Sequence, residues 1–329
     1  MKAWQVRSYG EPASVLEPAE AAVPEPGPNQ VRVRVRAAAL NFPDVLLCRG
    51  TYQIRPELPF TPGVELCGDV DALGEGVKAL AVGDRVIGNP ALPYGSLAEF
   101  ALAEVADLLP APDSLDDAQA SALHIAYQTG WFGLHRRARL QPGETLLVHA
   151  AAGGVGSAAV QLGKAAGARV IAVVGGAAKA GVARELGADI VVDRTDPGVD
   201  IVRVVKEATG GRGADVIFDP VGGDAYAASA KCVAFEGRIL VVGFAGGKVP
   251  TPALNHALVK NYSIVGLHWG LYKQYAPAEI TAAHEELCKL AANGAIAPLI
   301  GGRLPLAQAP EALTRLGAGD STGRLVVLP

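Results

Sequence analysis

The feature that most constrains the fold is an apolar run that leads directly into a glycine-rich turn. Residues 146–157 read LLVHAAAGGVGS, and an Ala-rich helical pattern follows over 158–166. Glycines let a backbone turn sharply and approach a ligand closely, and the free amides of a helix N-terminus attract anions. A strand, a glycine-rich turn and a helix in this order therefore predict a cradle for the pyrophosphate of a dinucleotide.

The match to the dinucleotide fingerprint G-x-G-x-x-G is incomplete, because Ala150 stands where the first glycine is usual. The structural context is stronger evidence than the exact glycine pattern. A strand precedes the turn, a helix follows it, and a second strand comes at the spacing expected of a βαβ unit. A glycine-rich turn without a ligand is the alternative. The cofactor contacts expected in this turn are Ala152, Gly153, Gly154, Val155 and Gly156.

The end of the second strand distinguishes between the two nicotinamide cofactors. An acidic residue there would bind the ribose 2′-hydroxyl and mark NAD. The strand instead ends at Gly175 without a carboxylate, and Lys179 and Arg194 follow where both can approach a 2′-phosphate. The pattern favours NADPH with these three residues as contacts, although the two cations could also be ordinary surface residues.

The 329 residues change in pattern along the chain. To about residue 110 the pattern is short and β-rich, with frequent Pro and Gly, and predicts a small irregular β-barrel. A mostly helical stretch is expected over 113–139. Beyond it, apolar strands alternate with helical segments and predict a doubly wound parallel sheet. These strands are expected at 145–149, 169–174, 190–193, 215–219, 238–242 and 263–267.

The segment after residue 270 is too small for a core of its own and is expected to pack on the first lobe. A helix is predicted over 277–293, with a final strand over 324–328. The expected fold class is therefore α/β, a Rossmann doubly wound parallel sheet plus a discontinuous β-barrel domain. The expected domains are 1–120 with 270–329 for the barrel and 121–269 for the nucleotide-binding domain.

Composition and charge exclude several classes of function. The net charge is −4 and half of the residues are hydrophobic, so neither a nucleic acid nor a membrane surface is an expected partner. Every apolar run ends before the roughly 18 residues of a membrane helix, and the N-terminus lacks a leader pattern. The four cysteines form no C-x-x-C pair, which is typical of reduced thiols. We expect a cytoplasmic location.

Several spaced motifs occur in order along almost the whole chain: Asn41–Asp44, Arg49–Tyr52, Leu58–Glu65, Gly83–Val86, the turn ending at Gly156 with Gln161 beyond it, and Gly187–Asp189. Together they resemble the zinc-free quinone oxidoreductase (zeta-crystallin-like) branch of the medium-chain dehydrogenase/reductase superfamily. The resemblance implies a GroES-like catalytic lobe, a Rossmann lobe and NADPH bound between them. It also implies a homodimer formed partly through the last Rossmann strand.

Departures from the zinc-dependent relatives predict that no metal is used. Those relatives place a Cys ligand near the position of Asn41 and a His before the Glu of a G-H-E motif, which here reads Gly63, Val64 and Glu65. A catalytic zinc needs three protein ligands, and two of the expected ones are missing.

The resemblance also implies which residues form the site. Tyr52 is the candidate acid or substrate-orienting hydroxyl, and Asn41 is expected to face the nicotinamide. Their alternatives are an aromatic that closes the lobe interface and an amide that caps backbone. The family pattern also implies cofactor contacts at Thr129, Leu267, His268, Trp269 and Arg324. The loops at the carboxyl ends of the strands, where ligands bind in such folds, add Val221, Gly243, Phe244 and Ala245, although each loop could also be an ordinary Gly-rich turn.

Without a metal, the site suits acceptors that are already activated by conjugation. The predicted function is the NADPH-dependent, metal-independent reduction of quinones or other conjugated carbonyl compounds, such as enones, by hydride transfer. Reduction of a short 2-enoyl-CoA, an enoyl thioester, is the enzymatic alternative, with Arg49, Arg55 and Lys273 on the CoA phosphates. An NADPH-binding structural or regulatory protein with little turnover is the alternative from another class.

Overall fold

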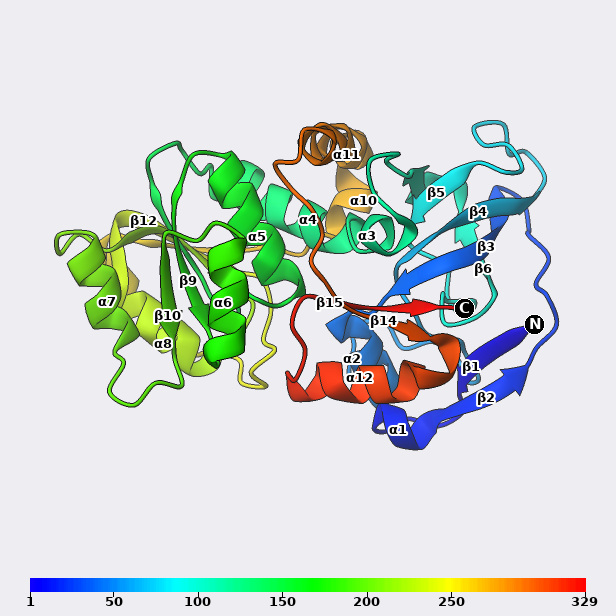
Figure 1. Ribbon diagram of the computed structural model, residues 1–329, viewed down its shortest axis with the longest axis horizontal. Coiled ribbons are helices and arrows are strands. Elements are labelled where there is room, and N and C mark those ends of the chain that lie inside the picture. The colour runs from blue at the N-terminus through cyan, green and yellow to red at the C-terminus, as the bar shows by residue number, and fades with distance from the viewer. The chain divides into compact units, whose positions relative to one another are not determined.

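The computed structural model describes residues 1–329, and the chain divides into two compact units. Unit 1 comprises Met1–Ile125 and Ala297–Pro329, and unit 2 comprises Ala126–Ile296. The chain passes from one unit to the other twice, so unit 1 is discontinuous in sequence (Figure 1). None of the helices is both long enough and apolar enough to cross a membrane.

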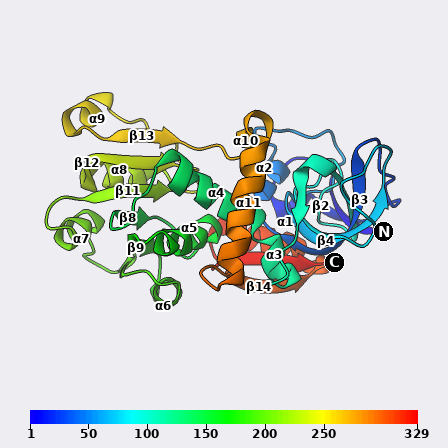
Figure 2. The same ribbon diagram turned by 90° about the horizontal axis from the view of Figure 1, so that it is seen from above.

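Unit 2 is built on a six-stranded parallel sheet in the order β10-β9-β8-β11-β12-β13. This is the order of a doubly wound dinucleotide-binding fold, so the predicted Rossmann sheet is confirmed. The strands are β8 (Thr145–Val148), β9 (Arg169–Val174), β10 (Ile190–Asp193), β11 (Ala214–Asp219), β12 (Val233–Val241) and β13 (Ser263–Gly266). Figure 2 shows β13 with α9 at the outer edge of this sheet.

Burial explains why these strands read as continuous apolar runs. Every residue of β8 and β11 is buried. Because successive side chains of a strand point to opposite faces, both faces of the sheet centre must be covered. The helices of the unit are α4 (His124–Trp131, which begins in unit 1), the π-helix η2 (Phe132–Arg137), α5 (Gly154–Ala165), α6 (Ala177–Glu185), α7 (Ile201–Ala208), α8 (Gly223–Cys232), α9 (Leu254–Lys260), α10 (Leu271–Tyr275) and α11 (Pro277–Ala292).

The structure differs from the predicted boundary at residue 270, because residues 270–296 lie in unit 2. Gln128 on α4 donates a hydrogen bond from Nε2 to the carbonyl of Ile280 on α11 at 3.2 Å. The rings of Phe132 and Tyr272 pack with their centroids 4.2 Å apart. The amphipathic pattern of a helix predicts that it covers a core, but it does not specify which of two cores.

Unit 1 contains a seven-stranded sheet in the order β14-β15-β3-β4-β5-β7, with β6 paired to β3, and a separate β1-β2 pair. The predicted small, irregular β-rich lobe is present, and the order of its strands does not close into a complete barrel. Register shifts interrupt the pairing of β3 with β4, and several contacts are isolated bridges rather than ladders. The strands are β1 (Lys2–Val6), β2 (Leu16–Glu20), β3 (Gln30–Ala39), β4 (Leu66–Leu73), β5 (Arg85–Gly88), β6 (Phe100–Glu104), β7 (Leu108–Pro110), β14 (Ile300–Pro305) and β15 (Arg324–Leu328).

The C-terminal segment completes the sheet of unit 1. Strand β15 runs antiparallel to β3, with Val326 opposite Ala39 and Val327 opposite Ala38. Leu325 and Val327 are buried in the same apolar core as Val45. The helices of this unit are α1 (Pro12–Val15), α2 (Phe42–Arg49), η1 (Val105–Asp107), α3 (Asp117–Ser121), η3 (Leu306–Gln308) and α12 (Ala309–Ala318).

Candidate functional site

The glycine-rich turn after β8 keeps the geometry of the dinucleotide motif. Ala150 adopts a left-handed φ of 49°, a conformation that glycine normally supplies. The Gly153 N–H donates to the Ala150 carbonyl at 2.8 Å, and a Cβ at Gly156 would collide with that same oxygen. Helix α5 begins at Gly154 and runs for 12 residues, so the positive end of its dipole lies at the turn.

The other predicted cofactor residues of unit 2, apart from Thr129, follow the remaining strands. The carboxyl ends of parallel strands meet at one edge of a sheet, so these residues share that edge. Two of the loops are joined, because Ala245 N–H donates to the carbonyl of Pro220 and Gly246 N–H to that of Val221, both at 3.0 Å. The buried carboxylate of Asp219 accepts from the Val221 N–H at 2.9 Å.

Arg194 lies against the end of β9. A Cβ built on Gly175 would be 3.2 Å from one guanidinium nitrogen of Arg194 and 3.3 Å from its Nε. Asp193 Oδ1 accepts from the Gly176 N–H at 2.7 Å, and backbone hydrogen bonds of this kind lower the pKa of Asp193. The absence of a side chain at Gly175 therefore gives the guanidinium its place at the sheet edge, and Lys179 stands in the first turn of α6.

Thr129 and Trp269 are connected through Gln128. Thr129 is buried on α4, and the neighbouring Gln128 accepts a hydrogen bond from Trp269 Nε1 at 3.2 Å. The Leu267 N–H donates to the carbonyl of Val241 at 3.0 Å, which extends the alignment of β12 and β13 past the end of β13. The structure thus ties α4, the helix that carries Thr129, to Trp269 after β13 through the neighbouring Gln128.

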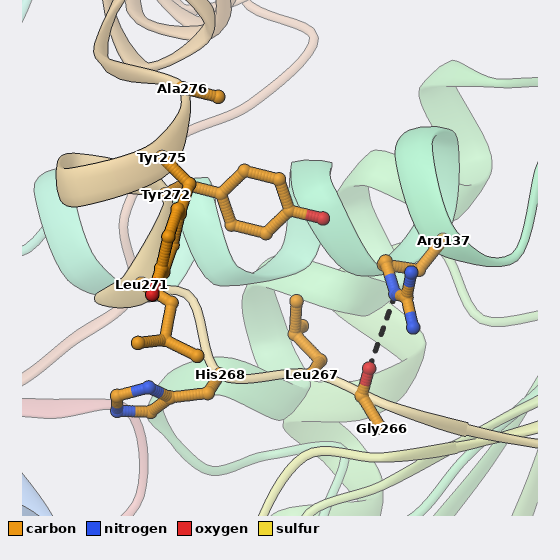
Figure 3. A pocket seen from close by; sticks show the side chains of 8 residues that line it. All are labelled: Arg137, Gly266, Leu267, His268, Leu271, Tyr272, Tyr275 and Ala276. Carbon is orange, nitrogen blue, oxygen red and sulfur yellow. Dashed lines mark hydrogen bonds between the residues drawn. The ribbon is translucent and has the colours of Figure 1, made fainter.

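A cavity of about 250 Å³ lies beside Leu267 and His268 in unit 2. Figure 3 shows the rings of Tyr272 and Tyr275 on one side and the Arg137 guanidinium on the other. Arg137 Nε donates to the carbonyl of Gly266 at 3.2 Å. The sequence did not predict this cavity, because its α10 wall was assigned to the first domain.

In unit 1, Asn41 occupies the N-cap position of α2. Its backbone N–H donates to Asp44 Oδ2 at 2.7 Å in a capping box. Its side-chain Nδ2 donates to the Ala39 carbonyl at 3.0 Å and to Glu65 Oε2 at 2.9 Å. Asn41 therefore takes part in a backbone cap, and whether it also faces the nicotinamide stays a prediction.

Asp44 is a buried carboxyl that was not among the site residues predicted from the sequence. Its Oδ1 accepts from the backbone N–H groups of Gly63 and Val64 at 3.1 and 3.0 Å. Burial raises the pKa of Asp44 to about 7, although hydrogen bonds and the charge of Arg324 act in the opposite direction. An acidic residue three positions after an Asn was the signal of a capping box, but no sequence pattern predicts the burial.

Glu65 is fully buried and binds three donors. Its Oε2 accepts from Arg324 at 2.5 Å as well as from Asn41, and its Oε1 accepts from the Ile125 N–H at 2.6 Å. Burial raises the pKa of Glu65, and the charge of Arg324 is the largest opposing influence. Arg324 is only 5% exposed, so the structure places this predicted cofactor contact in a buried ion pair.

Tyr52 follows α2, which ends at Gly50 in a left-handed conformation with φ of 67°. The side chain is half-buried and packs against the core of unit 1. Burial, followed by the charge of Asp44, raises the pKa of the Tyr52 hydroxyl. The phenol is therefore neutral near pH 7 and can donate a hydrogen bond.

Comparisons with known proteins agree with this architecture. The alcohol dehydrogenase GroES-like domain family matches residues 27–113, and the zinc-binding dehydrogenase family matches residues 154–286. The quinone oxidoreductase-like protein 2 homolog of Nematostella vectensis is 41% identical over 306 residues, which are 92% of this chain and 82% of the relative. The chain belongs to the quinone oxidoreductase branch of the medium-chain dehydrogenase/reductase superfamily.

Other proteins are similar over the whole chain or nearly all of it. Escherichia coli quinone oxidoreductase complexed with NADPH has a TM-score of 0.92 and 31% identity, with both chains fully covered. A mycocerosic acid synthase-like polyketide synthase of Mycobacterium tuberculosis is 33% identical over 327 residues. These are 98% of this chain but 15% of that relative, so the likeness is to one part of a much larger protein.

The residues of this medium-chain dehydrogenase/reductase do not fit a catalytic zinc. Across residues 1–329 no group of three or more His, Cys, Asp or Glu side chains is arranged to hold a metal ion. Asn41 and Val64 offer no thiolate or imidazole, and the Arg324 cation is paired with Glu65. A zinc ion needs three such ligands, which this site does not supply.

We expect ionisation of Asp44 to destabilise the protein as the pH rises. The pKa is about 7 in the folded state and 3.8 as its ordinary value, so the folded state alone holds the proton between these values. The free energy of unfolding should therefore fall through this window, by at most about 1.4 kcal/mol per pH unit from this group. Urea unfolding of the wild type and of Asp44→Asn, measured across the window, checks the effect.

Asp44→Asn should be less stable at low pH, because an NH2 group replaces one of the two oxygens that accept from backbone N–H groups, but it should lack this component of the pH dependence. Asp196→Asn, at an exposed aspartate, is the control and should keep the wild-type slope. Equal slopes in the wild type and Asp44→Asn would contradict the assignment.

Proposed function

We propose that the chain reduces quinones or other conjugated carbonyl compounds with NADPH, by hydride transfer and without a metal ion. The observation that carries the proposal is the side-chain set of unit 1. An amide at Asn41 and an apolar side chain at Val64 stand where a zinc-using relative places metal ligands. The same unit offers a neutral phenol at Tyr52 and a buried Glu65–Arg324 ion pair. An acceptor that is activated by its own conjugation needs hydrogen-bond donors rather than a Lewis acid.

The proposed reaction divides between cofactor and protein. When bound, NADPH supplies a hydride to an electron-poor carbon of the acceptor. Negative charge then develops on the acceptor oxygen, as an enolate or a hydroquinone anion. We assign Tyr52 as the donor to this oxygen, because its raised pKa keeps the hydroxyl protonated. Water returns the proton to Tyr52 after transfer.

NADPH is the proposed cofactor because of the residues at the end of β9. A 2′-phosphate carries about two negative charges, and a guanidinium binds such a group through paired hydrogen bonds. Arg194 lies against Gly175, with Lys179 on the next helix. The remaining contacts proposed for NADPH are Thr129, Ala152, Gly153, Gly154, Val155, Gly156, Val221, Gly243, Phe244, Ala245, Leu267, His268 and Trp269.

Arg194→Gln should raise the KM for NADPH by about 10- to 100-fold, because it removes a hydrogen bond between charged groups. The KM for NADH should change little. Gly175→Asp should move the preference toward NADH, since a carboxylate there repels the phosphate and can bind the ribose hydroxyls.

Steady-state kinetics with both cofactors measure the preference. Arg184→Gln, at an exposed arginine of α6, the helix that carries Lys179, is the control and should leave both KM values unchanged. Equal changes for NADPH and NADH in Arg194→Gln would be incompatible with a 2′-phosphate site.

Reduction of an enoyl thioester is the second candidate function. The similarity of nearly the whole chain to part of a polyketide synthase favours it. Of the cations considered for CoA phosphates, Arg49 makes two hydrogen bonds of 2.9 Å to Glu11, whereas Arg55 lies over the ring of Tyr9 at 4.3 Å. Arg55 is therefore a better candidate than Arg49, whose charge is already balanced.

Anaerobic oxidation of NADPH against a panel of acceptors separates these functions. The panel contains 9,10-phenanthrenequinone, 1,4-benzoquinone, an α,β-unsaturated ketone and acrylyl-CoA, with and without a chelator. We expect chelator-resistant turnover of a quinone or an enone, and a kcat lowered about 100-fold or more in Tyr52→Phe.

The control for Tyr52→Phe is Tyr94→Phe, at an exposed tyrosine of unit 1. Turnover of acrylyl-CoA alone would make the chain an enoyl-CoA reductase. NADPH binding without turnover of any acceptor would support a structural or regulatory protein.

We also propose that two copies associate through the β13 edge of unit 2. Strand β13 ends the six-stranded sheet, and an unpaired edge is a template for a further strand. Leu254, Leu258 and Val259 on the adjoining α9 are 73%, 76% and 78% exposed. Apolar side chains gathered beside an open edge are typical of a protein–protein interface.

Leu258→Glu should weaken this association by about 30-fold or more, because it places a charge at the centre of the apolar surface. Light scattering after size-exclusion chromatography, over a range of concentrations, measures the mass. Val82→Glu, at a valine of unit 1 that is 64% exposed, is the control and should leave the mass unchanged. A wild-type monomer at every concentration would rule the dimer out.

A further inference from the structure

The Glu65 carboxylate joins three parts of unit 1 that are distant in sequence. It accepts from Asn41 just before α2, from Arg324 at the start of β15, and from the Ile125 N–H in the first turn of α4. All of the charged and polar side chains involved are at most 5% exposed. The carboxylate is thus the common acceptor of a buried network that includes a proposed site residue.

This network fixes the orientation of the Asn41 amide. Nδ2 lies 3.0 Å from the Ala39 carbonyl and 2.9 Å from Glu65 Oε2, and both of these groups only accept. Turning the amide over would bring its oxygen against two acceptors, which leaves only one orientation. Both N–H groups of the amide therefore point into the network. Its oxygen faces the backbone N–H of Asp44 in the capping box and keeps a second lone pair that can accept from a ligand.

The ion pair with Arg324 stabilises the charged form of Glu65, in which both carboxylate oxygens accept hydrogen bonds. Its carboxylate is fully buried, and a charged group in that position requires a partner. Arg324 supplies this opposite charge, and its guanidinium donates a hydrogen bond to Glu65 Oε2. The Nε of Arg324 has no hydrogen-bond acceptor within residues 1–329. A neutral amide at position 65 would present an NH2 group either to Asn41 Nδ2 or to the Ile125 N–H, and two donors would then oppose each other.

We infer that Glu65 and Arg324 are positioning residues that hold Asn41 as a hydrogen-bond acceptor toward the bound cofactor. Asn41 then selects a group that donates, such as a ribose hydroxyl or a carboxamide N–H of the nicotinamide half. The inference rests on the proposed function, in which Asn41 faces that half of NADPH. It also gives Arg324 a role through Asn41 and Glu65 rather than as a direct contact to the cofactor.

A double-mutant cycle tests this inference. The proteins are the wild type, Glu65→Gln, Asn41→Ala and the double variant, each checked for folding by thermal unfolding. The readouts are the Kd of NADPH from its fluorescence, and kcat and KM with the best acceptor. A loss of stability alone would appear in the unfolding temperature without changing how the two substitutions combine.

Glu65→Gln should lower kcat/KM by about 10- to 100-fold, because a small misplacement of a ligand-binding group has an effect of this size. If Glu65 acts through Asn41, the same substitution should change kcat/KM by less than about 3-fold once Asn41 is alanine. The Kd of NADPH should show the same non-additivity. Arg324→Lys keeps the charge but not the fork of donors, and should give an intermediate effect that is also lost in Asn41→Ala.

The matched control is Glu144→Gln. It breaks the ion pair of Glu144 with Arg238, whose atoms are 2.7 Å apart and whose side chains are 22% and 19% exposed. This pair lies in unit 2 at the amino ends of the strands, away from every proposed contact. Glu144→Gln should lower stability, and its effect on kinetics should be small and additive with Asn41→Ala.

Three results would overturn the inference. One is an equal loss from Glu65→Gln in the wild type and in Asn41→Ala, which would make Glu65 only a structural residue. Another is an Asn41→Ala variant with unchanged NADPH binding and unchanged turnover. The third applies if Glu65→Gln does not fold: the effects of Arg324→Lys and Asn41→Ala on kcat/KM would then be additive.

Failure of the proposed reaction can be told apart from failure of the inference. If NADPH binds and the cycle in its Kd is non-additive, but no acceptor is reduced, the inference holds and the reaction is wrong. If NADPH does not bind at all, both are wrong.

Discussion

The pairing of β8 with β11 is the interaction on which the rest of unit 2 depends. The chain first adds β9 and β10 on one side of β8, then returns and places Phe218 of β11 beside Val148 of β8. The direction in which the sheet grows reverses at this point, and ligands of such folds bind at the carboxyl ends of the strands where it does so. The turn after β8 and the loop after β11 lie there, so the strand order itself determines where a cofactor can be held.

Much of unit 2 was predictable because short stretches of its sequence specify its strands and turns. Strands buried on both faces read as continuous apolar runs, and the turn at Gly153 and Gly156 is marked by residues that only a tight backbone requires. The open sheet of unit 1 was not predictable, because short strands such as β6 find partners that no local pattern specifies. The sequence placed α10 and α11 with the first domain instead of with unit 2 for a similar reason, since an amphipathic face does not identify the core that it covers.

The candidate site was predictable only in part. Family resemblance gave Asn41, Tyr52 and Arg324, and the lack of a carboxylate near Gly175 indicated the cofactor. Neither signal predicted that Asp44 is part of the site. Neither predicted the contact of Glu65 with Arg324, two residues that are 259 positions apart in the sequence. Most acidic residues lie on the surface, so their burial depends on a tertiary arrangement that supplies donors and an opposite charge.

The position of β15 has a consequence for the order in which the protein is made. At about 5 to 20 residues per second, a ribosome needs roughly 10 to 50 s to pass from Glu65 to Arg324. During this time Glu65 lacks its cation, and the neighbouring edge of β3 lacks β15. All of unit 2 emerges within the same interval. The nucleotide-binding unit can therefore mature on the ribosome, whereas the amide at Asn41 is fixed only when the last strand docks.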